Sequence, residues 1–145
     1  MTKITKSNVQ GIIRSLSKQY KVRTTFSKSI KCRGLSRYWR RSITINSTCT
    51  TREQMSVFFH ELGHIYCYDN GLWKNYHLDK FPGDMTDEEK WLCYNTAIKA
   101  ERWIDKWAEK EMKKHYPDLK FITSYECPKV IKNFKIELKK ELCLN

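Results

Sequence analysis

The segment FFHELGHIYCYDNG, residues 58–71, places two histidines and a glutamate within a run of mainly aromatic and aliphatic side chains. Burying these polar groups costs free energy unless each of them finds a partner. His60 and His64 are four residues apart, so on an α-helix their imidazoles lie about one turn apart on one face. This H-E-x-x-H pattern lets two imidazole nitrogens bind zinc while Glu61 reaches the attacking water. We therefore expect a fold that buries this helix and supplies a further zinc ligand.

The flanking residues indicate where this helix begins and ends. Thr50 and Glu53 match a capping box, with the threonine as N-cap and the glutamate at the third helical position. The sequence DNG at residues 69–71 supplies a stop, so we expect the helix to reach about Tyr68. Gly63, between the histidines, allows another element to approach closely. H-E-x-x-H is frequent by chance, but the mid-helix position, the upstream cap and this glycine favour a metal site.

A catalytic zinc site needs a third protein ligand and one open position. A long helix is predicted from a start at Thr86 to an end forced by Pro117. Glu101 lies in the middle of the apolar stripe of this helix, and Asp105 follows one turn later. We expect Glu101 to bind zinc and Asp105 to accept a hydrogen bond from the second nitrogen of His60. The alternative is that Glu101 pairs with a lysine or arginine of another element.

The chain after the H-E-x-x-H helix offers a second candidate for the third ligand. The longer motif H-E-x-x-H-x-x-G-x-x-H is absent, because a cysteine and an asparagine replace its glycine and its last histidine. His77 becomes the third ligand if residues 73–81 fold back over the site. If Glu101 is the ligand, His77 or Tyr76 is placed to stabilise the oxyanion of the tetrahedral intermediate. A surface position for His77 is the third alternative.

The rest of the chain predicts a helix, a small sheet and then three helices. The first helix runs from a cap at Ser7 or Asn8 to about Tyr20, and the last starts at Pro128. The inner stripe of the last helix is expected to contain Val130, Ile131, Phe134, Leu138 and Leu142. Strands are expected at residues 22–28, 29–32 and 38–46, with a turn at Gly34, irregular chain at 72–85 and extended chain at 121–125. These elements predict one α+β domain over residues 1–145, with a small antiparallel or mixed sheet packed on the H-E-x-x-H helix and two further helices.

The charge of the chain indicates acidic partners. Its formal net charge is +12 and its pI is about 9.5, which favours association with acidic molecules, including nucleic acid. The densest basic cluster consists of Arg37, Arg40 and Arg41 around Tyr38 and Trp39. We interpret it as a candidate exosite for an acidic or nucleic-acid-bound protein target. A solvated basic surface is the simpler interpretation.

Neither a membrane span nor a disulfide framework is expected. No stretch approaches the roughly 18 consecutive apolar residues of a membrane span, and the N-terminal residues do not form a signal peptide, so we expect a cytoplasmic protein without a membrane partner. The six cysteines show no C-x-x-C spacing. We expect free thiols, mostly buried as small hydrophobic side chains.

Two motifs give the chain a resemblance to a known family. HELGH and the later AERWIDKWA resemble the compact ImmA/IrrE-type metallopeptidases, many of which are encoded by phages and mobile elements. That family typically has E-x-E-A-[ND]-x-[FW]-A as its second motif. The chain matches it at Glu101, Asp105, Trp107 and Ala108 and departs from it at residues 103 and 104. The resemblance covers residues 50–110 and implies a minimal zincin-like domain with a gluzincin-like zinc site. SprT-like proteins, which use a more distant histidine as third ligand, are the alternative within the zincins.

These observations predict a small zinc-dependent metalloendopeptidase that hydrolyses peptide bonds in a protein or peptide substrate. The strand ending at residues 43–46 is expected to flank the cleft and to pair with an extended substrate. The alternative is a basic protein that binds nucleic acid or a partner and carries a structural or vestigial metal site, since Tyr38, Trp39, Trp73 and Tyr76 are available for stacking on bases. A structural zinc site would need a fourth protein ligand, for which Cys67 is the nearest candidate.

Overall fold

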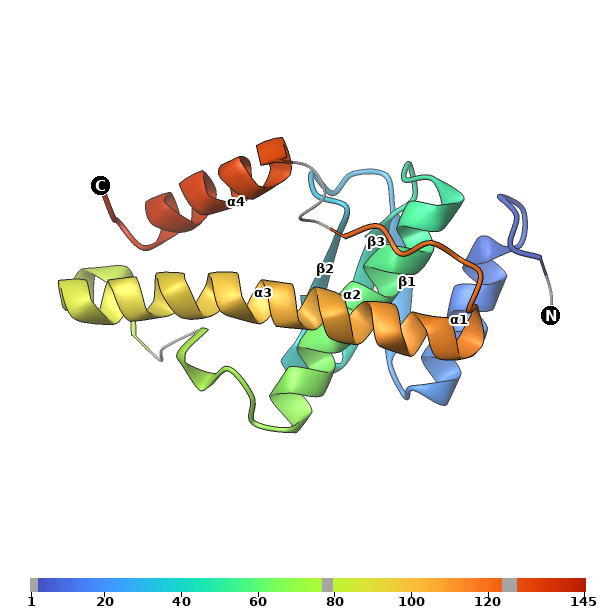
Figure 1. Cartoon of the computed structure of the whole chain (residues 1–145), viewed down its shortest axis with the longest axis horizontal. Helices are drawn as coiled ribbons and strands as arrows, with labels where there is room; N and C mark the ends of the chain where they lie inside the picture. The colour runs from blue at the N-terminus through green and yellow to red at the C-terminus, as the bar shows by residue number, and fades with distance from the viewer. Residues whose placement is uncertain (1–2, 77–79, 124–127) are drawn as a thin grey trace.

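The structure, a computed structural model, describes residues 3–76, 80–123 and 128–145. Its helices and strands are α1 (Val9–Gln19), β1 (Arg23–Ser27), β2 (Gly34–Arg37), β3 (Ser42–Asn46), α2 (Thr51–Asp69), α3 (Asp87–His115) and α4 (Pro128–Glu141). Short 3-10 helices are η1 (Tyr38–Arg40), η2 (Lys74–Tyr76) and η3 (Pro82–Asp84). Figure 1 shows α3 running along the molecule across α2, with α4 lying beside one half of α3. The expected α+β class with a small mixed sheet is confirmed.

The sheet has the strand order β1-β3-β2, in which β1 is parallel and β2 antiparallel to β3. Ile43 and Ile45 of β3 are fully buried, whereas the residues between and beside them are partly exposed. This alternation is the period of two that the sequence predicted. Because β3 is the central strand, both of its edges are bonded to neighbouring strands.

Two predicted strands were placed wrongly. The second strand is Gly34–Arg37 and not residues 29–32, and the strand expected at 38–46 is confined to Ser42–Asn46. Arg37 pairs with Ser42 across the β2–β3 hairpin, so residues 38–41 must reverse the chain. They do so through η1 and a left-handed residue, Arg41, with φ of 52°.

Gly34 lies in β2 and not in the expected turn. A Cβ at this position would lie 2.3 Å from Cγ1 of Val57 on α2 and 3.2 Å from the carbonyl oxygen of Thr44. The first distance is shorter than real Cβ contacts allow and the second is tighter than most of them, so any other side chain would force Val57 or β2 to shift. Glycine is therefore required because β2 passes directly against α2, the helix that carries both histidines.

Both predicted ends of α2 are confirmed. Oγ1 of Thr50 accepts a hydrogen bond from the backbone N–H of Glu53 at 3.2 Å, and Oε2 of Glu53 accepts one from the backbone N–H of Thr50 at 2.9 Å. At the other end, Gly71 has φ of 64°, and the N–H groups of Gly71 and Leu72 bond to carbonyls of the last helical turn. This is a Schellman motif, which satisfies carbonyl groups that the helix leaves unpaired.

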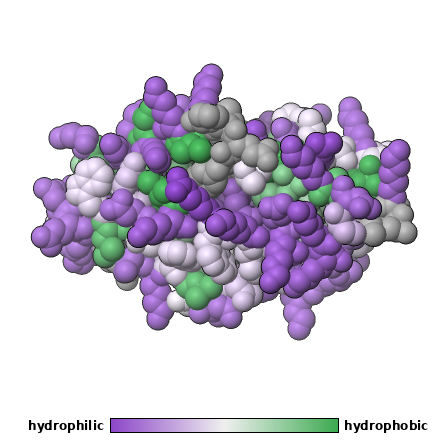
Figure 2. Space-filling view, viewed as in Figure 1, coloured by the Kyte–Doolittle hydropathy of each residue, from purple (hydrophilic) through white to green (hydrophobic). Residues whose placement is uncertain are grey.

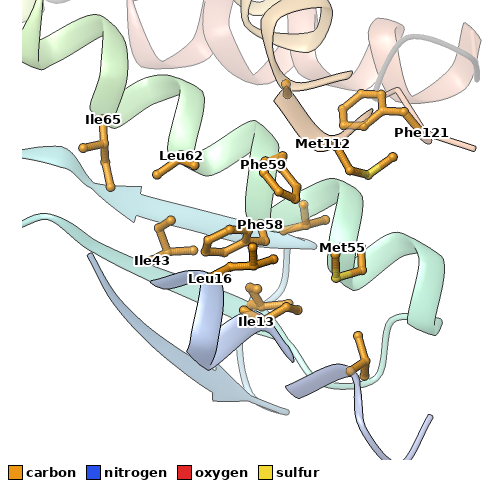
Figure 3. Packing of buried hydrophobic residues seen from close by; sticks show 14 residues of the cluster. Ile13, Leu16, Ile43, Met55, Phe58, Phe59, Leu62, Ile65, Met112 and Phe121 are labelled. Carbon is orange, nitrogen blue, oxygen red and sulfur yellow. The ribbon is translucent and has the colours of Figure 1, made fainter. Parts of the chain in front are cut away.

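The hydrophobic core lies on more than one side of α2. Figure 3 shows Phe58 beside Ile43 and Leu16, on the side of the sheet and α1, and Phe59 on the side of Met112 and Phe121. All six of these side chains are at most 4% exposed. Close packing on both sides fixes the position of α2, because a shift of this helix would displace the core side chains around it. The polar side chains that α2 carries are therefore held in fixed positions.

Gly63 brings α3 close to α2. A Cβ at Gly63 would lie 2.7 Å from Cγ2 of Ile104 and 3.3 Å from Cε3 of Trp107, both on α3. Ile104 is one turn from Glu101, so this approach determines how near Glu101 comes to the histidines. The close approach that the sequence predicted at Gly63 is confirmed.

We expect Gly63→Ala to lower the free energy of unfolding by about 1–3 kcal/mol, because α3 must shift to admit the methyl group. Equilibrium unfolding in urea measures the change. Gly11→Ala is the matched control, since Gly11 is an exposed position of α1 with nothing within 4 Å of the added Cβ. That control is expected to raise stability by up to about 1 kcal/mol. Equal effects of the two substitutions would contradict the close packing of α2 and α3.

The remaining predictions have mixed outcomes. Helix α3 begins after the N-cap Thr86 and ends before Pro117, as predicted.

No strand occurs in the described part of residues 72–85 or at residues 121–123, and residues 124 and 125 lie outside the described chain. The described cysteines are free thiols, but only Cys67 and Cys93 among them are buried, so burial of most cysteines was a wrong prediction. Among the described helices, none is long and apolar enough to cross a membrane.

Candidate metal centre

Helices α2 and α3 bring three predicted ligands together. Nε2 of His60 lies 2.9 Å from Oε2 of Glu101, and Nε2 of His64 lies 3.1 Å from Oε1 of the same carboxylate. The two imidazole rings are 5.2 Å apart between centroids. One ligand atom from each residue lies within 4.8 Å of the others. Residues separated by about 40 positions in the sequence thus converge on one small volume.

Asp105 lies behind His60. Its Oδ1 is 2.6 Å from Nδ1 of His60, and its side chain is buried. A carboxylate in this position fixes the orientation of the ring and directs Nε2 toward Glu101 and His64. The structure therefore places Asp105 where the spacing on α3 predicted it, and its role as a positioning residue remains a prediction.

The pKa values follow from this arrangement. Burial by itself lowers the pKa of His60, but the hydrogen bonds to Asp105 and Glu101 outweigh burial and hold the pKa well above its usual value. Burial by itself raises the pKa of Glu101, but the neighbouring His64 and His60 have the larger, opposite effect and hold this pKa well below its usual range. Glu101 is therefore ionised at neutral pH, which is the form that binds a cation.

The donor set fits a divalent cation. Two imidazole nitrogens and one carboxylate oxygen are ligands that zinc prefers, and three protein ligands leave one position open. Both nitrogens of His60 face carboxylate oxygens, so a protonated ring donates from each. A cation that replaces the Nε2 proton would meet the same negative charge of Glu101.

Comparison with protein-family models places the whole arrangement in a known family. Residues 6–130 match the model described as IrrE N-terminal-like domain, Peptidase M78. The chain belongs to this family. Membership confirms the resemblance drawn from HELGH and AERWIDKWA, and it implies a metallopeptidase that acts on protein substrates. No curated protein and no solved structure matches the chain.

Tyr76 approaches the metal centre of this IrrE N-terminal-like domain from η2. Its hydroxyl donates a hydrogen bond to Oε1 of Glu101 at 2.6 Å, and its ring lies edge-on to His64 at 6.0 Å between centroids. The structure thus connects Tyr76 to the candidate ligand Glu101, and the oxyanion role remains a prediction. His77 lies outside the described residues.

Cys67 does not complete a closed structural site. It is buried one turn after His64, and burial, together with the charge of Glu101, raises the pKa of its thiol to about 12. Among the described residues, the ligand cluster consists of His60, His64 and Glu101 without Cys67. This arrangement favours an open centre over a structural one.

A cavity of about 630 Å³ opens beside the metal centre. His60, His64 and Glu101 line it together with Glu61, which is buried on the same helix. The expected base therefore shares a cavity with all three candidate ligands. This volume lies within the range of roughly 300–1,000 Å³ that is usual for ligand pockets.

Helix α4 forms a wall of this cavity that the sequence did not predict. This wall includes Ile131, Phe134 and Glu137 of α4. The inner stripe predicted for α4 is confirmed at Leu138 and Leu142, which are buried, and at Phe134, which packs against their cluster. Ile131 and Phe134 are partly exposed, and both also line the cavity. The family match ends at residue 130, so most of α4 lies beyond it. An amphipathic period shows which face is apolar and does not show whether that face meets a core or a cleft.

The predicted basic cluster is divided by the fold. Arg41 forms an ion pair with Asp69 and donates hydrogen bonds to the backbone carbonyls of Tyr20 and Lys21, so it joins α2 to the chain after α1. Arg37 and Arg40 are exposed, and the cations that line the cavity are Lys31 and Arg33.

Binding of nucleic acid receives no support from the family match. Figure 2 shows hydrophilic side chains over most of one face, with hydrophobic residues in small separate patches. The high positive charge agrees with this surface but does not by itself indicate a specific partner. The exosite at Arg37 and Arg40 remains a prediction.

Proposed function

We propose that the chain is a zinc-dependent metalloendopeptidase in which His60, His64 and Glu101 bind the ion. The observation that supports this most strongly is the convergence of the three donor atoms within 4.8 Å, beside a cavity that Glu61 also lines. The family supplies the reaction class, and the donor set supports zinc as the metal.

Each polar residue of the centre has a separate task in the proposed mechanism. When bound, the cation would polarise the scissile carbonyl and lower the pKa of the attacking water. Glu61 accepts a proton from that water and later delivers it to the leaving amine. Asp105 orients His60, and Tyr76 orients Glu101 through their hydrogen bonds. Tyr76 or His77 is also the proposed donor to the oxyanion of the tetrahedral intermediate.

The substrate strand cannot pair with β3, contrary to the prediction for residues 43–46. β3 is the central strand, and it is bonded to β1 on one edge and to β2 on the other. β2 is an edge strand of this sheet, and its first residue, Gly34, lines the cavity of the metal centre. We therefore propose that an extended substrate pairs with the outer edge of β2.

Removal and return of the metal test the proposal. The protein is treated with a chelator, dialysed and reloaded with one equivalent of Zn²⁺, and a proteome-derived peptide library serves as substrate. We expect one zinc per chain, hydrolysis by the loaded protein, loss of hydrolysis after chelation and its recovery after reloading. Hydrolysis that persists at the same rate without metal would contradict the proposed zinc dependence.

A further inference from the structure

A second cavity, of about 370 Å³, adjoins the metal centre. His64 lines both this cavity and the larger one that contains Glu61. Tyr76 lines it as well, and its hydroxyl donates a hydrogen bond to Oε1 of Glu101. A group in the second cavity would therefore lie immediately beside the reacting centre.

The lining of this cavity is mainly aromatic and aliphatic. It includes Tyr38, Tyr68, Leu72, Trp73 and Ile104. Tyr68 and Leu72 are 55% and 39% exposed and line the same hollow, and exposed apolar side chains gathered in one groove are typical of ligand-binding sites. Among the lining residues that the structure describes, Lys74 is the one lysine, and no arginine, aspartate or glutamate accompanies it.

The loop that forms one wall is held in place before any ligand arrives. Gly71 and Leu72 are bound by the Schellman motif, and the N–H of Tyr76 bonds to the carbonyl of Trp73 at 2.9 Å. Trp73 has φ of 56°, which is costly for a bulky side chain. Such strain persists where the surrounding contacts enforce it, and it is often found at binding sites. The indole also contacts the ring of Trp103 at 6.3 Å between centroids.

We propose that this cavity binds one large apolar side chain of the peptide substrate, such as phenylalanine, leucine or methionine, next to the scissile bond. The inference rests on the proposed peptidase function and specifies its substrate class. Burial of that side chain against Leu72 and Trp73 stabilises the bound peptide by the hydrophobic effect. Lys74 at the same cavity disfavours a basic side chain there, because like charges repel.

Sequencing of the cleavage products tests the proposal. The zinc-loaded protein is incubated with the proteome-derived peptide library, and the residues on each side of every cut are counted. We expect large apolar residues to be enriched at one position by at least about tenfold over glycine. Leu72→Lys is expected to remove this enrichment. Leu92→Lys, at an exposed leucine of α3 that lines neither cavity, is expected to leave it unchanged. An even distribution, or one that Leu72→Lys does not alter, would overturn the proposed subsite.

A binding measurement separates this proposal from the proposed chemistry. N-acetyl-L-phenylalaninamide and N-acetylglycinamide are titrated into the zinc-loaded protein, and the backbone amide signals of Cys67 and Leu72 are followed by NMR. We expect saturable shifts with the phenylalanine derivative and at least about tenfold weaker binding both of the glycine derivative and of either compound to Leu72→Lys. Saturable binding without any peptide cleavage would count against the peptidase function and support the apolar site. Cleavage without selective binding would count against the site alone.

Discussion

Glu61→Gln is expected to lower kcat for peptide hydrolysis by about 10²–10⁴-fold, the usual contribution of a general acid–base residue. Glutamine has nearly the same shape as glutamate but cannot accept the proton of the attacking water. Because Glu61 lies outside the cluster of His60, His64 and Glu101, we expect the zinc content to stay at that of the parent protein. The loss of rate corresponds to about 2.7–5.5 kcal/mol of transition-state stabilisation.

Rate and metal content must be measured on the same preparations. Elemental analysis gives the zinc per chain, and product formation from a cleaved library peptide gives kcat. Glu88→Gln, in the exposed first turn of α3, controls for the loss of one carboxylate elsewhere. If Glu61→Gln hydrolyses peptide as fast as Glu88→Gln, then Glu61 is not the base. This comparison also excludes a contaminating peptidase, whose activity would be the same in both preparations.

Glu101→Ala is expected to remove zinc from the purified protein and hydrolysis with it. The substitution leaves two imidazoles, and it removes the one charged donor of the cluster. It also leaves the hydroxyl of Tyr76 without the carboxylate that accepts its hydrogen bond. Competition with a chromophoric chelator measures the zinc affinity, and circular dichroism shows whether the variant is folded.

Substitution of the ligand Glu101 should lower zinc affinity more than substitution of its neighbour Asp105. Asp105→Asn keeps all three donors and changes only the partner of His60, so we expect a fall in zinc affinity of about 10–100-fold. Glu109→Ala, a surface position of α3 paired with Lys113, should bind zinc as the parent does. Full zinc occupancy in Glu101→Ala would transfer the third-ligand role to another residue, with His77 as the first candidate. Glu101→Gln, which preserves side-chain volume, distinguishes loss of the charge from creation of a cavity.

The local features of the chain were predictable, because neighbouring residues determine them. The capping box at Thr50 and Glu53 needs only residues three positions apart, and the stop at Gly71 needs a residue that tolerates positive φ. The helical period places His60 and His64 on one face of α2, and it places Glu101 and Asp105 on one face of α3. The family motifs could be recognised for the same reason, since each lies within one helix.

The errors concern segments whose conformation depends on distant partners. A glycine at position 34 predicted a turn. The structure shows that glycine is needed there because Val57, 23 positions later, leaves no space for a Cβ. Residues 38–41 have strand-like side chains, yet the pairing of Arg37 with Ser42 makes them a turn. Arg41 belonged to a basic cluster in the sequence, whereas its ion pair with Asp69 makes it a structural residue.

By itself the sequence determined the class of the domain, the ends of α2 and α3 and the residues that can bind a metal, because short-range geometry and side-chain chemistry decide these features. Tertiary structure alone decided which elements surround the metal centre. The edge strand β2, the wall supplied by Phe134 of α4 and the apolar cavity at Leu72 and Trp73 all arise from packing between segments far apart in the chain. Such packing depends on shape and volume in three dimensions, which a hydrophobic pattern along one helix or strand does not specify.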